Sequence, residues 1–305
     1  MQHVESMGSF RSEMRDELAD SAKDNVKKRR ELEILLYQKD LGKSIRGLRV
    51  CIDIRDVKWI ISLSYLAGIA VAELFIALAN PAVGICFHLA LVIFLAFHSA
   101  LAGKRLSHEL YLALSLAPLA RIVSLSLDLS LFSQTYAYLI YSLPLLVGSL
   151  ITIRMLKFKP ADIALRLRVK NIPIQLLVAL TGIVFGLIEF YLIRPDSLVS
   201  SLTLQKVIVP ALILLIATGF VEELAFRGVI QRSAISSLGP WGLVYTAMLF
   251  AMMHIGYLSA SLWLLVFVAG IFFGWTVKKT GSLFGVTLSH GLANICLYII
   301  FPLII

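Results

Sequence analysis

The sequence predicts an all-α protein: a polytopic transmembrane bundle of about eight or nine helices, preceded by a charged soluble extension. The composition indicates this class first, because 59% of the 305 residues are hydrophobic, only 15% are charged, and the mean hydropathy is +0.86. Soluble domains are about 45–50% apolar and about 25% charged. A water-soluble fold could not bury so much apolar surface, so lipid must be the solvent for most of this chain.

The density of charge changes sharply near Lys58. Residues 1–58 mix acidic and basic side chains and lack the short apolar stretch and small-residue cleavage site of a signal peptide. We expect them to form a cytoplasmic N-terminal extension of one or two soluble or membrane-surface helices. This extension could be a solvated tail that orients the protein or a module that binds a partner, and the sequence favours neither.

Beyond Lys58, apolar segments follow one another with short interruptions, and several reach the roughly 20 residues that a bilayer core demands. The expected spans are 59–79, 82–102, 109–127, 134–153, 173–193, 206–230, 240–257, 261–277 and 283–303. An eight-span version results if one short segment does not cross. We divide this part into N-terminal transmembrane helices (59–156), an amphipathic cytoplasmic segment (157–172) and a core that carries the motifs below (173–305).

The net charge of +9 is better explained by membrane topology than by nucleic-acid binding, which we do not expect. Most basic residues beyond the extension fall in alternate loops, which places these loops and the N-terminus in the cytoplasm. Membrane lipid is therefore an expected partner. Cys51, Cys86 and Cys296 are scattered without C-x-x-C spacing, so the sequence indicates neither a disulfide framework nor a thiolate metal site.

Two adjacent carboxylates and an arginine occupy one hydrophobic segment, where unpaired charges would cost several kcal/mol. Glu223 and Arg227 are separated by four residues and share a helix face, so a buried ion pair between them is expected. Glu222 points about 100° away from Glu223 and has no partner nearby in the sequence. It is therefore free to titrate or to hold a water molecule.

Two further polar elements follow in neighbouring spans. The first is Phe250-Ala251-Met252-Met253-His254, and the second contains His290 and Asn294, which share a helix face at a spacing of four. Gly270 and Gly274 form a small-xxx-small pair in the span between them, which lets helices approach closely. That approach could bring both histidines near Glu222.

This set of side chains can perform hydrolysis. A carboxylate and imidazoles can polarise a water molecule, while an asparagine amide and an imidazole can donate to the oxyanion of a tetrahedral intermediate. The carboxylate of Glu222 and the nitrogens of His254 and His290 could instead bind a divalent metal such as zinc. Spacing alone does not choose between a site without a cofactor and a zinc site.

The elements E-E-x-x-x-R, F-x-x-x-H and H-x-x-x-N, in this order, resemble the CAAX prenyl endopeptidase and bacteriocin-processing family of intramembrane proteases, abbreviated CPBP and also called Abi. The resemblance covers roughly 173–303 and is closest over 219–296. It also includes the linking segment 270–283. No part of the family pattern can be mapped onto the extension or onto the first four spans.

The resemblance implies a role for each matching position. Glu222 corresponds to the glutamate that activates water, and His254 to the histidine that shares this water. His290 and Asn294 correspond to the pair that stabilises the oxyanion. Between the metal-dependent and the metal-independent mechanisms considered for the family, we favour glutamate-activated water, because candidate metal ligands are few and an asparagine suits an oxyanion.

The same resemblance gives Glu223 a structural role, paired with Arg227, and Phe250 supports the site as part of its motif. Other ionisable residues in the spans share no spacing, and we expect them to make structural hydrogen bonds. They are Glu73, His88, His98, Arg121, Asp128 and Glu189.

The expected function is therefore that of an intramembrane endopeptidase, which hydrolyses a peptide bond of a membrane-associated peptide or of a prenylated, CAAX-type protein. One alternative is a scaffold or bacteriocin-immunity protein that keeps the fold without proteolysis. Another is a transporter with a proton relay, against which stands the lack of an inverted repeat.

Overall fold

A computed structural model of the chain describes Lys28, Glu33 and residues 54–102, 107–127, 132–167 and 171–305. By its internal contacts the chain divides into two units, Met1–Asp53 and Ile54–Ile305. The helices expected in the N-terminal extension fall almost wholly outside the described residues. The second unit contains everything that follows.

All regular elements of the described residues are helices, which confirms the predicted all-α membrane class. Eight of these helices are long and apolar enough to cross a membrane. The expected span 206–230 and most of the expected span 240–257 fall within one of the eight, Leu204–Met252. The structure therefore matches the eight-span version of the prediction.

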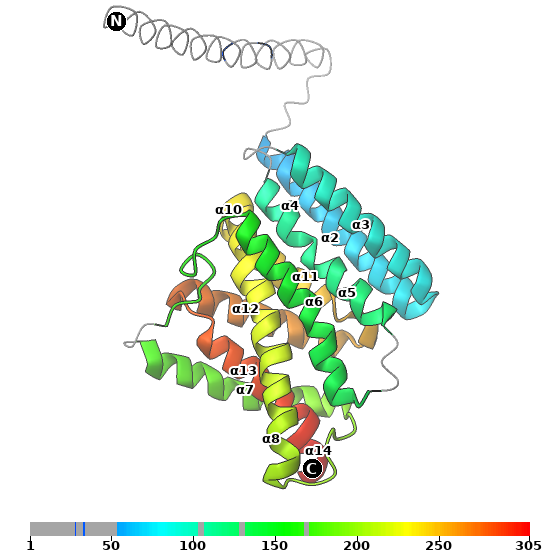
Figure 1. Ribbon diagram of the computed structural model, residues 1–305, viewed down its shortest axis with the longest axis vertical. Coiled ribbons are helices and arrows are strands. Elements are labelled where there is room, and N and C mark those ends of the chain that lie inside the picture. The colour runs from blue at the N-terminus through cyan, green and yellow to red at the C-terminus, as the bar shows by residue number, and fades with distance from the viewer. Residues whose placement is uncertain (1–27, 29–32, 34–53, 103–106, 128–131, 168–170) are drawn as a thin grey trace, which may run out of the picture. The chain divides into compact units, whose positions relative to one another are not determined.

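The first four spans form one group of packed helices (Figure 1). The group consists of α2 (Ile54–Leu78), α3 (Pro81–Leu101), α4 (His108–Leu114), α5 (Leu116–Ser126) and α6 (Gln134–Met155). Helices α4 and α5 together make one span that is interrupted at Ser115. Along the group, α2 packs on α3, α3 packs on α4 and α5, and α5 packs on α6.

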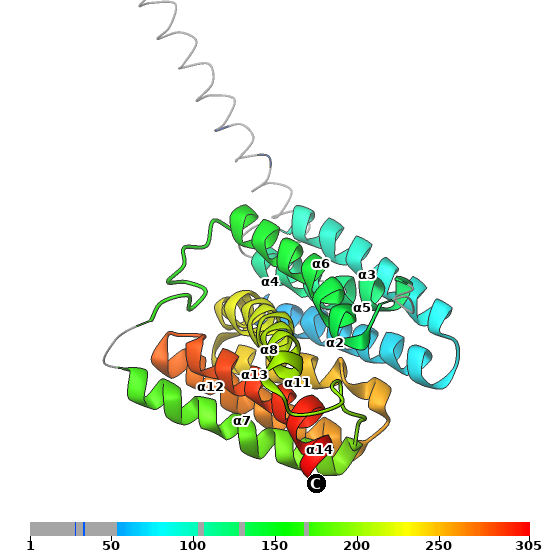
Figure 2. The same ribbon diagram turned by 60° about the horizontal axis from the view of Figure 1, so that its bottom comes forward.

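The second half of the chain is built around a long helix with two π-helical stretches. It runs through α8 (Leu204–Ile213), η4 (Leu214–Phe220), α9 (Val221–Glu223), η5 (Leu224–Ile230) and α10 (Gln231–Leu238). The stretch η4 contacts both α6 and α13, so this helix lies between the N-terminal group and the C-terminal helices (Figure 2). π-helical turns are rare and frequently occur at functional sites. The two π-helical stretches η4 and η5, which flank Glu222, therefore mark this part of the helix as a candidate site.

The remaining helices pack around this long helix. They are α7 (Ile172–Ile193), α11 (Gly242–Met252), α12 (Ala260–Thr280), α13 (Phe284–Ile295) and α14 (Phe301–Ile304), with short turns η6 (Gly239–Trp241) and η7 (Ile255–Tyr257) and the π-helical η8 (Cys296–Ile300). The long helix ends at Gly239, whose φ of +66° strongly favours glycine. There the chain turns into α11.

The 11 residues of α11 explain why 240–257 is not a separate full span. At about 1.5 Å per residue, α11 is about 16 Å long, roughly half of the about 30 Å core of a bilayer. Its side chains are mostly buried within the protein, and the chain turns back through η7 into α12. His254 lies just beyond the end of this short helix.

Close backbone contacts hold the C-terminal helices together. A Cβ atom on Gly182 of α7 would lie 2.1 Å from the Ser289 carbonyl oxygen of α13, so only glycine fits there. At the pair predicted to allow close approach, Gly270 faces Ala247 of α11 and Gly274 faces Gln231 of α10. These contacts bring the motif-bearing helices together.

Helix α7 presents its large apolar side chains on its outer surface. Leu177, Leu180 and Val184 are exposed, whereas Gln175 and Gly182 on the opposite face are buried. Large apolar side chains that face outward and small ones that face neighbouring helices are typical of helices in lipid. The chain is an integral, multi-pass membrane protein.

Candidate functional site

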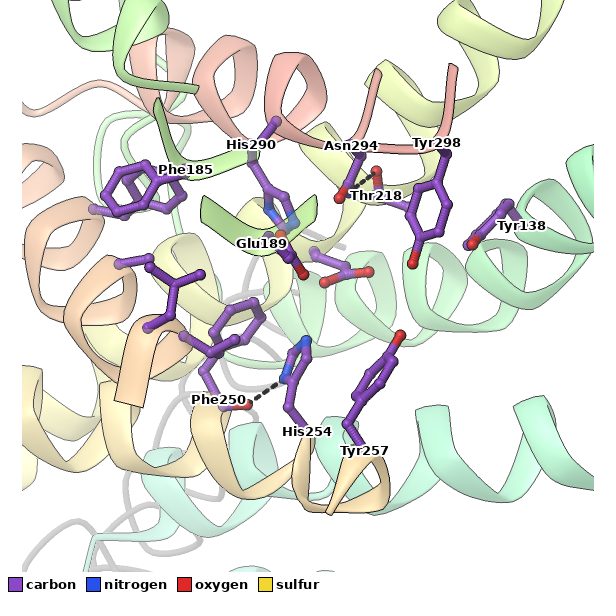
Figure 3. A pocket seen from close by; sticks show the side chains of 16 residues that line it. Tyr138, Phe185, Glu189, Thr218, Phe250, His254, Tyr257, His290, Asn294 and Tyr298 are labelled. Carbon is purple, nitrogen blue, oxygen red and sulfur yellow. Dashed lines mark hydrogen bonds between the residues drawn. The ribbon is translucent and has the colours of Figure 1, made fainter. Parts of the chain in front are cut away.

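The four residues predicted to be catalytic, which are far apart in the sequence, line one cavity of about 150 Å³. They are Glu222 of α9, His254 just after α11, and His290 and Asn294 of α13. Figure 3 shows the rings of His254 and His290 pointing toward each other across this cavity. The structure therefore brings the whole predicted set together.

The His254 ring has a defined hydrogen-bond partner. Its Nδ1 lies 2.8 Å from the Phe250 carbonyl oxygen, one helical turn earlier (Figure 3). Because a carbonyl oxygen only accepts, Nδ1 must carry the proton, and in the neutral ring Nε2 then holds a free lone pair. That nitrogen is available to accept a proton or hydrogen bond from a molecule in the cavity.

His290 is held by Glu223. The Nδ1 of His290 lies 2.9 Å from Glu223 Oε1, and the Nη1 of Arg227 lies 2.9 Å from the same oxygen. The ion pair expected between Glu223 and Arg227 is thus present, and both side chains are buried. The bond to His290 was not expected from the sequence. Since a carboxylate only accepts, it fixes the proton on Nδ1 and leaves Nε2 of His290 for the cavity.

Phe250 packs between these groups. Its ring lies edge-on to the His290 ring at a centroid distance of 6.1 Å, and the Arg227 guanidinium carbon lies 4.3 Å from its centroid. The second contact is a cation–π interaction. Phe250 therefore touches His290 with its ring and anchors His254 through its carbonyl oxygen.

The amide of Asn294 is oriented by Thr218 of η4. Its Nδ2 donates to Thr218 Oγ1 at 2.7 Å, while the Thr218 hydroxyl donates to the Leu214 carbonyl oxygen (Figure 3). Because the threonine proton is used on Leu214, its oxygen must accept from the amide nitrogen. The second N–H of that nitrogen remains for a ligand.

Glu222 differs from its neighbour Glu223. Within the part of the chain that the structure describes, its carboxylate makes no hydrogen bond and no ion pair, and it lines the cavity together with the two histidines and Asn294. A carboxylate in an apolar environment without a protein partner is unfavourable unless it binds water or a ligand. Its position therefore suits a group that holds a water molecule.

A second, larger cavity of about 530 Å³ adjoins the first. The two share Glu222, His254 and Tyr257 among their lining residues. The second cavity extends between α5 and α6, where its wall includes Leu125 and Leu145. Its volume is within the range of about 300–1,000 Å³ found for ligand pockets, and most of its lining is apolar.

Sequence reasoning missed several polar residues of the first cavity. Tyr257 and Tyr298 point their hydroxyl groups into it, and Thr218 and Tyr138 lie beside them (Figure 3). Tyr257 follows His254 by three residues and Tyr298 follows Asn294 by four, so helical spacing could have found both. Nothing in the sequence marks Tyr138. Glu189, considered in the sequence but not chosen, also lines the cavity.

The arrangement does not fit a bound metal ion. Among the described residues, no three His, Cys, Asp or Glu side chains are grouped as a ligand set. Glu222, His254 and His290 were the ligands expected if a metal were used. The neighbouring carboxylate, Glu223, already accepts from Arg227 and His290.

Comparison with protein families matches residues 204–296 to a model described as type II CAAX prenyl endopeptidase Rce1-like. The match begins at the start of α8 and ends just after α13, so it includes all three motifs and leaves out α2 to α7. No curated protein and no solved structure gives a significant match to the chain. Residues 204–296 are thus similar to a Rce1-like domain.

Proposed function

We propose that the protein is an intramembrane endopeptidase in which Glu222 activates the attacking water molecule. The observation that carries the proposal is the unpartnered Glu222 carboxylate, which lines one cavity with two histidines and an asparagine whose other partners are already fixed. The endopeptidase description of the matched family supports the same reaction class.

In the proposed reaction, a water molecule binds between Glu222 and Nε2 of His254. Glu222 removes a proton as the water oxygen attacks the carbonyl carbon of the substrate. The protonated carboxyl group then gives this proton to the departing amine, and the peptide bond breaks. The products are a peptide with a new carboxylate and a peptide with a new amine.

The oxyanion of the intermediate would be stabilised from α13. The free N–H of Asn294 can donate to it directly. His290 uses its Nδ1 proton on Glu223, so its Nε2 donates only when the ring is an imidazolium. Glu223 orients the ring through this bond, and Arg227 on the same oxygen holds the carboxylate in place.

The proposed substrate is a membrane-associated peptide that reaches Glu222 through the larger cavity. The apolar lining of that cavity suits a hydrophobic or lipid-modified segment. The matched family is described by its prenylated CAAX substrates, so a prenylated C-terminal peptide is the first substrate to test. A cytoplasmic N-terminus and contacts with membrane lipid remain part of this proposal.

The test is cleavage of a peptide library that includes a farnesylated C-terminal peptide by the full chain in detergent. Glu222→Gln keeps the size of the side chain but cannot take the proton, so we expect cleavage to fall by at least about 10²-fold. Glu109→Gln on α4, outside both cavities, is the matched control and should retain activity. Parallel reactions with a chelator test metal dependence. Equal cleavage by the wild type and Glu222→Gln, or a folded wild type that cleaves nothing, would contradict the proposal.

A further inference from the structure

Three ionisable residues form a cluster inside the N-terminal helices, outside the Rce1-like domain. They are Glu73 of α2, His88 of α3 and Arg121 of α5. Arg121 Nε donates to Glu73 Oε1 at 2.7 Å, and His88 Nε2 lies 3.2 Å from the same oxygen. No spacing in the sequence groups these three residues. Because charged groups inside a membrane protein are expensive and often functional, their assembly calls for an explanation.

The cluster reaches the candidate site through a single hydrogen bond. The Nη2 of Arg121 donates to the carbonyl oxygen of Met253, the residue that caps the end of α11 and precedes His254. Carbonyl groups at the end of a helix lack partners within the helix and carry the negative end of its dipole. A guanidinium group at this position both satisfies and stabilises the helix end.

Within the described ranges, this is the one hydrogen bond that ties the backbone at Met253 and His254 to another segment of the chain. Among the described residues, all other hydrogen bonds of Met253 and His254 go to their own segment, between Leu249 and Tyr257. The His254 ring likewise stacks on Tyr257 and lies tilted against the Phe250 ring, both in that segment. The direction of the imidazole therefore depends on how the end of α11 is held.

Arg121 is suited to hold two groups at once. Its planar fork gives Nε to Glu73 and Nη2 to the Met253 carbonyl, and an ammonium group cannot reproduce this geometry. Glu73, the acceptor of the guanidinium, is fully buried, and the buried His88 ring lies against the same carboxylate oxygen. The side chain of Arg121 is 22% exposed and lines the larger cavity beside His254.

We infer that Arg121, mounted on Glu73 and His88, is a positioning residue that orients His254 toward the water held by Glu222. The N-terminal helices would thus complete the catalytic geometry of the Rce1-like domain, beyond anchoring it in the membrane. This inference rests on the proposed function for its kinetic consequence, but its structural consequence can be measured without any substrate.

The experiment measures the rate at which diethylpyrocarbonate modifies each histidine of the full chain, by mass spectrometry. His290 serves as the internal reference because Glu223 holds it independently of Arg121. We expect Arg121→Ala and Arg121→Lys to change the His254 rate several-fold and to leave the His290 rate unchanged. Added ethylguanidinium should restore the His254 rate in Arg121→Ala, since the vacated position opens on the larger cavity. Arg154→Ala at the end of α6 is the control for loss of a surface charge.

Once a cleaved peptide has been identified, both Arg121 variants should lower kcat by about 10- to 100-fold, while KM stays within about 2-fold. This loss of kcat is the one expected for a single charge-assisted hydrogen bond. Arg121→Lys keeps a cation beside Glu73, so it is the variant that tests the inference if Arg121→Ala does not fold. An unchanged His254 rate, or equal changes at His254 and His290, would overturn the inference. A wild type that cleaves nothing would count against the proposed function alone, because the modification rates still test the positioning role.

Discussion

Glu223→Gln is the substitution whose consequences the structure defines most completely. The buried Oε1 of Glu223 accepts from Arg227 and from His290, at 2.9 Å each. The amide that replaces the carboxylate carries no charge, so the buried guanidinium of Arg227 is left without its counterion. We expect a loss of stability and a loss of His290 orientation from one change.

The magnitude follows from the burial of the pair. Removing one partner of a buried ion pair costs about 3–5 kcal/mol, because the remaining charge is desolvated and unpaired. Arg227→Met should cost a similar amount, with about 0.5–2 kcal/mol of it from the lost cation–π contact with Phe250. In the double variant Glu223→Gln with Arg227→Met, neither charge remains. Its loss of unfolding free energy should therefore be about 2–3 kcal/mol smaller than the sum of the losses in the two single variants.

The assay is reversible unfolding in mixed micelles with added sodium dodecyl sulfate, followed by circular dichroism for the wild type and the three variants. Cleavage is measured alongside. The double variant should recover stability without recovering cleavage, because the amide that replaces the carboxylate carries no charge to support an imidazolium at His290. Additive costs, with a coupling energy below about 0.5 kcal/mol, would refute the assignment of a coupled buried pair.

Two further substitutions test neighbouring contacts. Gly182→Ala places a Cβ atom 2.1 Å from the Ser289 carbonyl oxygen, so it should force α7 from α13 and cost about 1–3 kcal/mol in the same unfolding assay, whereas Ala79→Gly, outside the core, should change little. An unchanged unfolding curve for Gly182→Ala would show that the two helices are not so close. Thr218→Val removes the acceptor that orients Asn294 and keeps the shape of the side chain, so kcat should fall about 10-fold with little change in KM. A change confined to KM would argue against an oxyanion role for the amide.

The membrane class and the helical bundle could be predicted because lipid imposes a length and a composition on each span. The Glu223–Arg227 pair could be predicted because a spacing of four fixes two side chains on one helix face. The expected span at 240–257 was too long because α11 is apolar throughout, and hydropathy does not distinguish a short buried helix from one that faces lipid.

Contacts between distant segments account for what the sequence did not predict. The bond from His290 to Glu223 joins residues 67 positions apart, and no local rule selects that carboxylate over Glu222. The cluster of Glu73, His88 and Arg121 likewise depends on which helices pack together. The domain division at 58, 156 and 172 and the roles of the site residues stay predictions.

The claim that Glu222 activates water for peptide hydrolysis is tested most directly by separating substrate binding from cleavage. The measurement is the Kd and the single-turnover cleavage rate of one farnesylated peptide with the wild type and with Glu222→Gln. The account predicts a Kd within about 2-fold of the wild type and a cleavage rate lower by at least about 10²-fold, because only proton transfer is removed. Cleavage by Glu222→Gln within about 10-fold of the wild-type rate would contradict it.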